Sequence, residues 1–391
     1  MKPLTGITII EFSTMVTASF ATMMMAEQGA RAIKVEPVGE GDPMRGLGTQ
    51  KGNMSGLFAN CNRGKESISV NLKDPQGLEI AKRLIVKADV VISNFRPGVM
   101  DSLGLGSAEL RSSNPRLIYM AVSGFGTKGP LSAAPAYDPV IQAHAGFTAT
   151  QGQQQPEFVR NLMCDKITAY SACQAVTAAL YQRSQTGDGQ HIDLSMLDAG
   201  LFFLFPDGFM QYTLLDEDIE HRPLLADLIY NLTLTKDGAV TISALTDEQR
   251  LGVANAAGLD NLNDDERFNS YRNIIKNIEA YREILAAQFI QMDTDELMQK
   301  LVANDVPCAR CHTPSQVLSQ EQIRANGTTS EVEHPVTGKM LVVHTPAMFA
   351  GNRLPLATPA PAYGQHTQKV LEELGFDAES YAEMTTAGIV G

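Results

Sequence analysis

The chain has 391 residues, of which 44% are hydrophobic and 19% charged. This composition is ordinary for a globular protein of two or three domains. A formal net charge of −13 repels phosphate backbones and excludes general binding to nucleic acid. No secretory signal precedes the first strand-like run, and no stretch is apolar enough to cross a bilayer. We therefore expect a cytoplasmic protein with no membrane partner.

Five scattered cysteines indicate free thiols in a reducing compartment. Cys308-Ala-Arg-Cys311-His312 matches the haem attachment pattern, but that chemistry requires export, and the sequence carries no export signal. No second cysteine pair completes a zinc site, and no H-E-x-x-H is present. We expect partly buried structural thiols, with neither a metal nor a tightly bound cofactor.

The first third of the chain alternates strands with helices. Buried strands are predicted from short apolar, β-branched runs at Ile7–Phe12, Arg31–Val35, Ala88–Ile92 and Arg116–Val122. Helices are predicted between them at Thr17–Gln28 and Pro75–Lys87. Strands separated by helices favour an α/β fold with a parallel, doubly wound sheet. Ligands of such sheets bind beyond the carboxyl ends of the strands.

A long helix is predicted over Lys166–Arg183, followed by a strand at His191–Leu197. The acidic segment Asp216–Arg222 indicates a domain boundary. Beyond it, two short strands around Asp237-Gly238 predict a hairpin, and three helical stretches follow at Asp247–Ala257, Ile278–Gln291 and Asp293–Asn304. We predict a large domain over 1–200, a linker over 201–225, a small α+β domain over 226–330, and a linker and C-terminal segment over 331–391 that returns to the large domain.

Asp165 lies between the apolar pair Met163-Cys164 and the predicted long helix. An aspartate in this place is often only a helix N-cap. It can also be a carboxylate that the helix N-terminus orients and keeps ionised at pH 7, ready to attack a carbonyl carbon. The two interpretations are compatible, because a capping position holds a nucleophile still.

Two further segments follow predicted strands. Asn94-Phe-Arg-Pro-Gly98 is either a simple β-turn or a binding turn that presents Arg96 and backbone amides to a ligand. The segment Lys34–Arg45 is either a flexible surface loop or a glycine-rich loop that a ligand approaches closely. Neither contains the P-loop or the G-x-G-x-x-G pattern, so a nicotinamide cofactor has no support. A G-x-S-x-G elbow is also absent, and lone His144 is expected to be structural.

Taken together, the sequence resembles the class III CoA-transferases, a family that includes formyl-CoA transferase, carnitine CoA-transferase and α-methylacyl-CoA racemase. The resemblance covers nearly the whole chain and rests on thirteen short motifs in order. They are Gly6–Phe12, Lys34–Pro37, Gly41–Arg45, Asn60–Lys65, Ser67–Asp74, Ala88–Gly98, Ser123–Gly126, Tyr137-Asp138, Asp165, Thr186–Gln190, Asp265–Phe268, Val306–Cys308 and Glu333–Pro335.

The resemblance implies a Rossmann-like, CoA-binding large domain and a homodimer of interlocked rings. It implies that Asp165 is the catalytic aspartate, which passes CoA from an acyl-CoA to a carboxylic acid through an aspartyl-acyl anhydride and an aspartyl-CoA thioester. Coenzyme A is then a substrate. The family's CoA contacts correspond to Val16, Thr17, Val70, Lys73, Asn94, Phe95 and Arg96, and Tyr137 corresponds to a pocket position next to the nucleophile.

Departures from the family pattern narrow the expected substrates. Some members have a further arginine where Ser102 stands. Formyl-CoA transferase has a glycine-rich flap, whereas Phe209–Asp237 contains no glycine, so formyl and oxalate are in doubt. The racemase branch has a histidine at the position of Tyr137 and a glutamate near Thr246, so racemisation is disfavoured. An acyl-CoA racemase or isomerase, or a non-catalytic acyl-CoA binder, stays the alternative.

Overall fold

The computed structural model describes residues 1–152 and 154–391. The chain divides into two compact units, one formed by Met1–Phe205 with Gly327–Gly391 and the other by Pro206–Asn326. The larger unit is therefore discontinuous in sequence, because the chain leaves it at Phe205 and returns at Gly327. The separate linkers predicted over 201–225 and 331–391 stay predictions.

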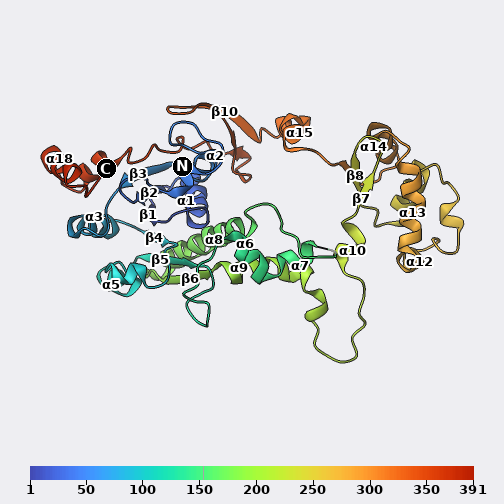
Figure 1. The fold of residues 1–391 in the computed structure, drawn as a ribbon, viewed down its shortest axis with the longest axis horizontal. Coiled ribbons are helices and arrows are strands. Elements are labelled where there is room, and N and C mark those ends of the chain that lie inside the picture. The colour runs from blue at the N-terminus through green and yellow to red at the C-terminus, as the bar shows by residue number, and fades with distance from the viewer. Residues whose placement is uncertain (153) are drawn as a thin grey trace. The chain divides into compact units, whose positions relative to one another are not determined.

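Six parallel strands form the sheet of the larger unit (Figure 1). The strands are β1 (Thr8–Phe12), β2 (Arg31–Glu36), β3 (Lys65–Ser69), β4 (Val90–Ser93), β5 (Ile118–Ser123) and β6 (His191–Ser195). Their order, β3-β2-β1-β4-β5-β6, reverses direction between β1 and β4, which makes the sheet doubly wound. The predicted α/β fold with a parallel sheet is confirmed. Strand β3 was not predicted, because Lys65 and Glu66 mask its short apolar pattern.

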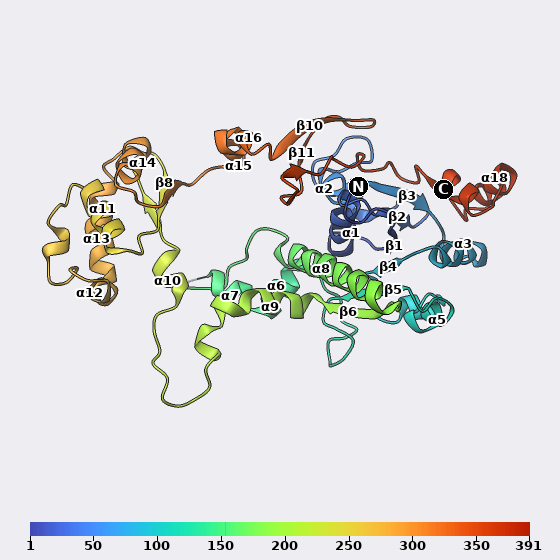
Figure 2. The same ribbon diagram turned by 180° about the vertical axis from the view of Figure 1, so that it is seen from behind.

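Both faces of the sheet are covered by helices. Alternate residues of one strand enter different cores: Ile10 and Phe12 face one cluster, while Ile9 faces the other. The first cluster is closed by α3 (Pro75–Val86), α5 (Ser107–Ser113), α17 (Thr367–Glu373) and α18 (Ala378–Thr386). The second is closed by α1 (Thr17–Glu27) and α8 (Met163–Thr186), which lie side by side in both views (Figures 1 and 2). Burial on both faces explains why β1, β4 and β5 are near-continuous apolar runs.

Shorter elements complete the larger unit. They are η1 (Pro43–Gly46), α2 (Gly56–Cys61), α4 (Val99–Ser102), α6 (Asp138–Ala145), α7 (Phe147–Gln151), α9 (Met196–Gly208, whose last residues enter the other unit), and the hairpins β10 (Thr329–His334) with β11 (Gly338–Val343) and β12 (Met348–Phe349) with β13 (Asn352–Arg353). Buried His334 fixes the first hairpin: its Nδ1 accepts from the amides of Val336 and Thr337, and its Nε2 donates to the carbonyl of Ala360. From the sequence, only a linker and a C-terminal segment that returns to the large domain were predicted here.

The smaller unit contains an antiparallel sheet with order β7-β8-β9 and a set of short helices. Its elements are η2 (Met210–Tyr212), α10 (Leu225–Ile229), β7 (Leu232–Leu234), β8 (Ala239–Ile242), α11 (Asp247–Ala256), η3 (Leu262–Asp264), α12 (Tyr271–Lys276), α13 (Ile278–Phe289), α14 (Thr294–Ala303), β9 (Cys308–Arg310), α15 (Pro314–Ser319) and α16 (Glu321–Ala325). The hairpin predicted around Asp237-Gly238 is confirmed, and the amide of Thr235 donates to the carbonyl of Gly238 across its turn.

All five cysteines are free thiols. Cys308 is half-buried and Cys311 exposed, so the expectation of partly buried thiols holds for only one of this pair. Among the described residues, no cluster of His, Cys, Asp and Glu could hold a metal ion. In the same part of the chain, no helix has both the length and the apolar character that spanning a membrane requires.

Candidate active site

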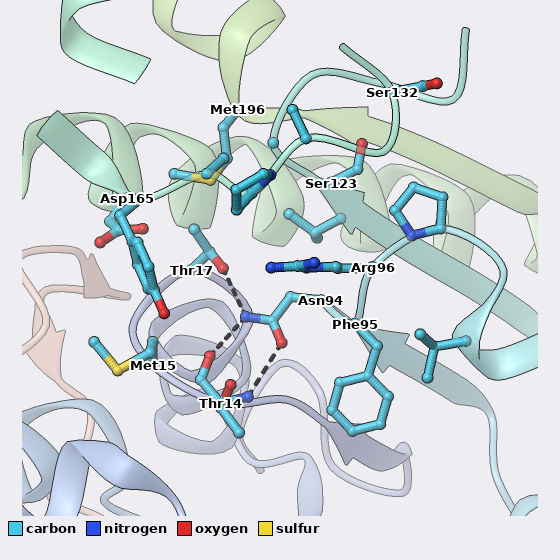
Figure 3. Close-up of a pocket in the computed structure, with 18 residues that line it drawn as sticks. Thr14, Met15, Thr17, Asn94, Phe95, Arg96, Ser123, Ser132, Asp165 and Met196 are labelled. Carbon is cyan, nitrogen blue, oxygen red and sulfur yellow. Dashed lines mark hydrogen bonds between the residues drawn. The ribbon is translucent and has the colours of Figure 1, made fainter. Parts of the chain in front are cut away.

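A cavity of about 410 Å³ opens at the carboxyl ends of β1, β4 and β5 (Figure 3). Its walls come from the loop after β1, the turn after β4, the end of β5, residues 132–137, and the first turns of α8 and α9. The cavity therefore lies where the winding of the sheet reverses, between β1 and β4. Ligands of doubly wound sheets bind at this switch point.

The loop after β1 is fixed to the turn after β4 by the side chain of Asn94. Its Oδ1 accepts from the amide of Thr14 at 3.1 Å, and its Nδ2 donates to the Thr14 carbonyl at 2.6 Å and to the Thr17 hydroxyl at 3.2 Å (Figure 3). The amide group thus has its donors and its acceptor engaged by protein. Beside it, the guanidinium of Arg96 points into the cavity, and Arg96 has no ion-pair partner among the described residues (Figure 3).

Asp165 occupies the first turn of α8. The helix begins at Met163 with Leu162 as its N-cap, so Asp165 is the third helical residue. The interpretation of Asp165 as an N-cap is therefore wrong, because the helix starts three residues earlier than its apolar pattern predicted. A first-turn carboxylate still experiences the helix N-terminus, and Asp165 contributes to the wall of the cavity.

Asp138, at the start of α6, holds the first turn of α8. Its Oδ2 accepts from the Asp165 amide at 3.0 Å, and its Oδ1 accepts from the Gln142 side chain at 2.6 Å. The same Gln142 amide nitrogen donates to the carbonyls of Val159 and Asn161, which lie in the segment leading into α8. A buried carboxylate and a buried amide thus determine where α8 begins and where Asp165 lies.

The electrostatics of the site raise the pKa of Asp165 to about 7. Burial is the largest cause, the neighbouring Asp138 carboxylate raises the pKa further, and Lys166 lowers it. The expectation that Asp165 stays fully ionised at pH 7 is therefore wrong, since the helix terminus does not outweigh these two effects. Near neutral pH the carboxyl group exists in both protonation states, which is a common property of catalytic groups.

The comparisons with known proteins agree with this geometry. A profile described as CoA-transferase family III matches residues 4–367. Succinyl-CoA:glutarate CoA-transferase of Mus musculus is 31% identical over 396 residues, which cover 100% of this chain and 91% of the relative. The chain belongs to CoA-transferase family III. It is a CoA-transferase, and its substrates are CoA thioesters and carboxylic acids.

Two further relatives extend the comparison. Succinate--glutarate CoA-transferase of Agrobacterium fabrum is 30% identical over 388 residues, covering 95% of this chain and 96% of the relative. The crystal structure of a CAIB/BAIF family protein from Brucella suis superimposes with a TM-score of 0.83 at 28% identity, covering 95% of this chain and 99% of that one. The family resemblance read from the sequence is confirmed.

The transferase brings together most of the residues predicted for its site. Thr17, Asn94, Phe95, Arg96 and Tyr137 contribute to the cavity that contains Asp165. Tyr137 is 66% exposed and Arg96 is also exposed, whereas the Thr17 side chain is buried against Asn94. These positions fit contacts with a bound substrate, but what each residue binds stays a prediction.

Three predicted CoA contacts lie outside the cavity walls. Val16 is buried in an apolar cluster with Met44 and Phe58. Val70 is buried in the core under α3 and pairs its backbone with Val390. Lys73 is exposed in the turn after β3. Side-chain contacts with CoA are therefore open to Lys73 but not to Val16 or Val70, whose side chains are already packed.

Among the site residues that sequence reasoning missed are two methionines and one carboxylate. Met15 and Met196 contribute to the cavity, and Asp138 holds Asp165 from behind. Met196 directly follows β6 and Met15 lies three residues beyond β1, so the rule that ligands bind at carboxyl strand ends could have found both. Asp138 belongs to a motif quoted for the resemblance, but its contact with Asp165 depends on packing between α6 and α8.

The segment Lys34–Arg45 is neither of the two loops that the sequence left open. Lys34, Asp42 and Arg45 are almost fully buried. Lys34 pairs with Glu11 at 2.8 Å and with Asp42 at 2.9 Å, and Arg45 pairs with Glu36 at 2.7 Å. Four of the five charged side chains of the segment are therefore buried in ion pairs, and its exposed residues are Pro37, Gly39, Glu40 and Pro43.

Proposed function

We propose that the transferase works by covalent catalysis at Asp165. The Asp165 carboxylate attacks the carbonyl carbon of a bound acyl-CoA, the C–S bond breaks, and an aspartyl-acyl anhydride and the CoA thiolate result. The thiolate then attacks the aspartyl carbonyl, which releases the first acid and leaves aspartyl-CoA. The acceptor carboxylate attacks this thioester to form a second anhydride, and the returning thiolate takes the acceptor acyl group and frees Asp165.

One observation carries this proposal: Asp165 is the carboxylate in the wall of a cavity at the switch point of the sheet. Its raised pKa has a direct consequence, because only the ionised carboxylate attacks a thioester. The attack becomes faster as pH rises through about 7. A carboxylate with a pKa near the working pH is also more basic, and hence more nucleophilic, than an ordinary surface aspartate.

The larger unit would act as a Rossmann-like CoA-binding domain, as its strand order supports. Arg96 is the cation suited to a CoA phosphate, because its guanidinium points into the cavity. Lys73 would assist from the turn after β3. The side chain of Asn94 would instead act through the loop that it holds, since its hydrogen-bonding groups are already engaged.

The relatives suggest the substrate class. The mouse and Agrobacterium fabrum proteins are named for transfer between succinyl-CoA or succinate and glutarate. We propose dicarboxylic acids of about the size of succinate and glutarate as donor and acceptor for this chain. Formyl and oxalate are disfavoured by the absence of glycine from Phe209–Asp237, the segment in which formyl-CoA transferase has its flap.

A homodimer of interlocked rings is supported by the surface of α9. Its side chains Leu201, Phe202, Phe203 and Phe205 are 38%, 83%, 52% and 42% exposed in the single chain. Apolar side chains gathered in this way mark association surfaces. Residues 201–225 and 331–391 would then be the linkers that thread through the partner. Sedimentation velocity would test the dimer, and its persistence until the chains unfold would test the interlocking.

Racemisation on the same fold lacks a second base. None of the 18 described residues that line the cavity is histidine. His144 lies outside this lining and packs edge-on against Phe125, with ring centroids 5.0 Å apart. A purified protein that exchanged the α-hydrogen of an acyl-CoA with solvent deuterium would restore this alternative.

The proposal is tested by incubating the protein with succinyl-, acetyl- and formyl-CoA against a panel of carboxylates that includes glutarate and oxalate. Mass spectrometry should find new dicarboxylyl thioesters, and brief incubation with the donor should leave a hydroxylamine-sensitive adduct on Asp165. Asp188→Asn, which removes an exposed carboxylate from a turn, serves as the control. Transfer without any adduct, and with both substrates required before release of free acid, would overturn the covalent mechanism.

A further inference from the structure

The loop after β1 is held by three polar side chains from separate parts of the chain. Lys34 donates to the carbonyl of Ser13 at 3.0 Å, and Asn94 binds the amide and carbonyl of Thr14. Asp42 accepts from the amide of Met15 at 3.1 Å. Three consecutive residues of one short loop are thus each fixed by a side chain of another segment, and the loop forms one wall of the active-site cavity.

Met15 has an unusual backbone conformation. Its φ is +63°, in the left-handed region that residues with a Cβ adopt only at a cost. Its side chain contributes to the cavity and packs against the apolar cluster around Phe58. Figure 3 shows it on the same side of the cavity as Asp165. Strain of this kind persists only where the surroundings hold it.

Asp42 supplies that hold. Its Oδ1 also accepts from the Met44 amide at 2.9 Å, which caps η1, and its other oxygen pairs with Lys34. The carboxylate is completely buried, and Lys34 is also paired with Glu11. Three contacts therefore fix Asp42: the Met44 amide of η1, the Lys34 ammonium, and the hydrogen bond that its own backbone amide donates to Glu36. Together they fix the oxygen that accepts from the Met15 amide.

We propose that Asp42 is a positioning residue for CoA transfer: it holds Met15 in the left-handed conformation and so fixes the wall that the acyl group meets beside Asp165. Asp42 affects the reaction only through the conformation of Met15. The statement about the acyl group rests on the proposed function, whereas the coupling between Asp42 and Met15 does not. The loss of alignment appears mainly in kcat, because the transition state requires the fixed wall more than substrate binding does.

The test is a double-mutant cycle that uses glycine to remove the left-handed penalty. Met15→Ala and Met15→Gly both delete the side chain, but only glycine adopts a positive φ freely. Each is made with Asp42 present and with Asp42→Ala, and kcat, KM and unfolding midpoint are measured. With Asp42 present, the two Met15 variants should have similar kcat. In the Asp42→Ala background, the glycine variant should exceed the alanine variant by roughly five- to thirtyfold in kcat.

Two controls separate positioning from stability. Asp42→Asn loses the same charge beside Lys34 but keeps an acceptor oxygen for the Met15 amide, so it should retain more kcat than Asp42→Ala at a similar unfolding midpoint. Ala350→Gly relieves a left-handed residue (φ +49°) in an exposed turn and should leave kcat unchanged. If the chains that carry Asp42→Ala do not fold, Asp42→Glu replaces that substitution, because it keeps the charge and displaces the oxygens by one methylene.

The result that overturns the proposal is a glycine-to-alanine ratio at position 15 that is the same with and without Asp42. Equal losses of kcat in Asp42→Asn and Asp42→Ala, in folded protein, would contradict it too. Failure of the covalent mechanism is distinguishable, because it would appear in the unaltered chain as transfer without an adduct on Asp165 and would leave the ratio at position 15 intact.

Discussion

Glu11 and Asp165 belong to two groups of carboxylates whose surroundings shift the pKa in opposite directions. Glu11 of β1 and Asp42 are buried with Lys34 of β2 and Lys65 of β3, and ion pairs with both lysines hold the pKa of Glu11 far below its usual value despite complete burial. Asp165 lies beside a second carboxylate, Asp138, and its pKa rises to about 7. The same residue type thus becomes a structural anion in one place and a reactive group in the other.

The difference in pKa shift comes from how close the cations lie to each carboxylate. In the first group each carboxylate has an ammonium within 3 Å, which offsets the cost of burial. In the second group Asp138 accepts from neutral donors, the Asp165 amide and the Gln142 side chain, and Lys166, the cation that lowers the pKa of Asp165, forms a hydrogen bond with Asn161. Burial and a neighbouring carboxylate destabilise the ionised form of Asp165. A covalent bond to a carbonyl carbon removes this charge, and its formation is therefore more favourable for Asp165 than for a carboxylate in an ion pair.

The largest expected effect tests the reactive group. Asp165→Asn is nearly isosteric but not nucleophilic, so CoA transfer should fall by at least about a thousandfold, as for other catalytic nucleophiles. The measurement is the initial rate of thioester exchange by mass spectrometry.

The same variant checks the electrostatics of Asp165. Because folding raises the pKa of this carboxyl group, its ionisation opposes folding as pH rises from about 4 to 7. Asp165→Asn should therefore raise the unfolding midpoint at pH 8 and change it little at pH 4. A lower midpoint at pH 8 would show that Asp165 is a structural anion after all.

The next largest effect is expected from a change in the buried ion pairs of Glu11 and Asp42. Lys34→Met removes the ammonium from Asp42 and one of the two ammonium groups from Glu11, and so leaves the buried charge of Asp42 uncompensated. Loss of one partner of a buried pair costs about 3–5 kcal/mol of the free energy of unfolding. Urea denaturation measures the change. A loss below about 1 kcal/mol would mean that the ion pairs of Lys34 stabilise the protein no more than surface pairs do. The buried cations would then not explain the difference between the two groups of carboxylates.

Asp138→Asn sharpens the comparison, because it removes the neighbouring charge and keeps oxygen and nitrogen atoms in place. The pKa of Asp165 should fall, so the rising limb of the pH profile of kcat/KM should move to lower pH, by about one unit. Asp188→Asn should leave the profile in place. A limb that stays near pH 7 would mean that burial alone sets the pKa of Asp165.

The smallest effect comes from an exposed pair. Glu79 and Arg83 form an i,i+4 pair at 2.9 Å on α3, with both side chains about half exposed. Glu79→Gln should lower the free energy of unfolding by only about 0.3–0.5 kcal/mol, and less in high salt. A loss comparable to that of Lys34→Met would show that burial does not distinguish these pairs.

The sequence predicted much of the site because strand ends are local signals. Ile7–Phe12 and Ala88–Ile92 are apolar runs, so the turns that follow them were placed at one edge of the sheet, and Thr17, Asn94 and Arg96 do contribute to one cavity. The start of α8 was misplaced, because Gln142 and Asp138, distant in sequence, determine where that helix begins.

By itself the sequence determined the alternation of strands and helices, the parallel sheet, the family and the aspartate at its cavity, since each follows from local pattern or from motifs in order. Only the tertiary structure decided that Asp165 has a pKa near 7 and that Lys34 and Asp42 are buried partners rather than loop residues. Charges interact through space and through burial, and neither their distance nor their desolvation is written in the spacing of residues along the chain.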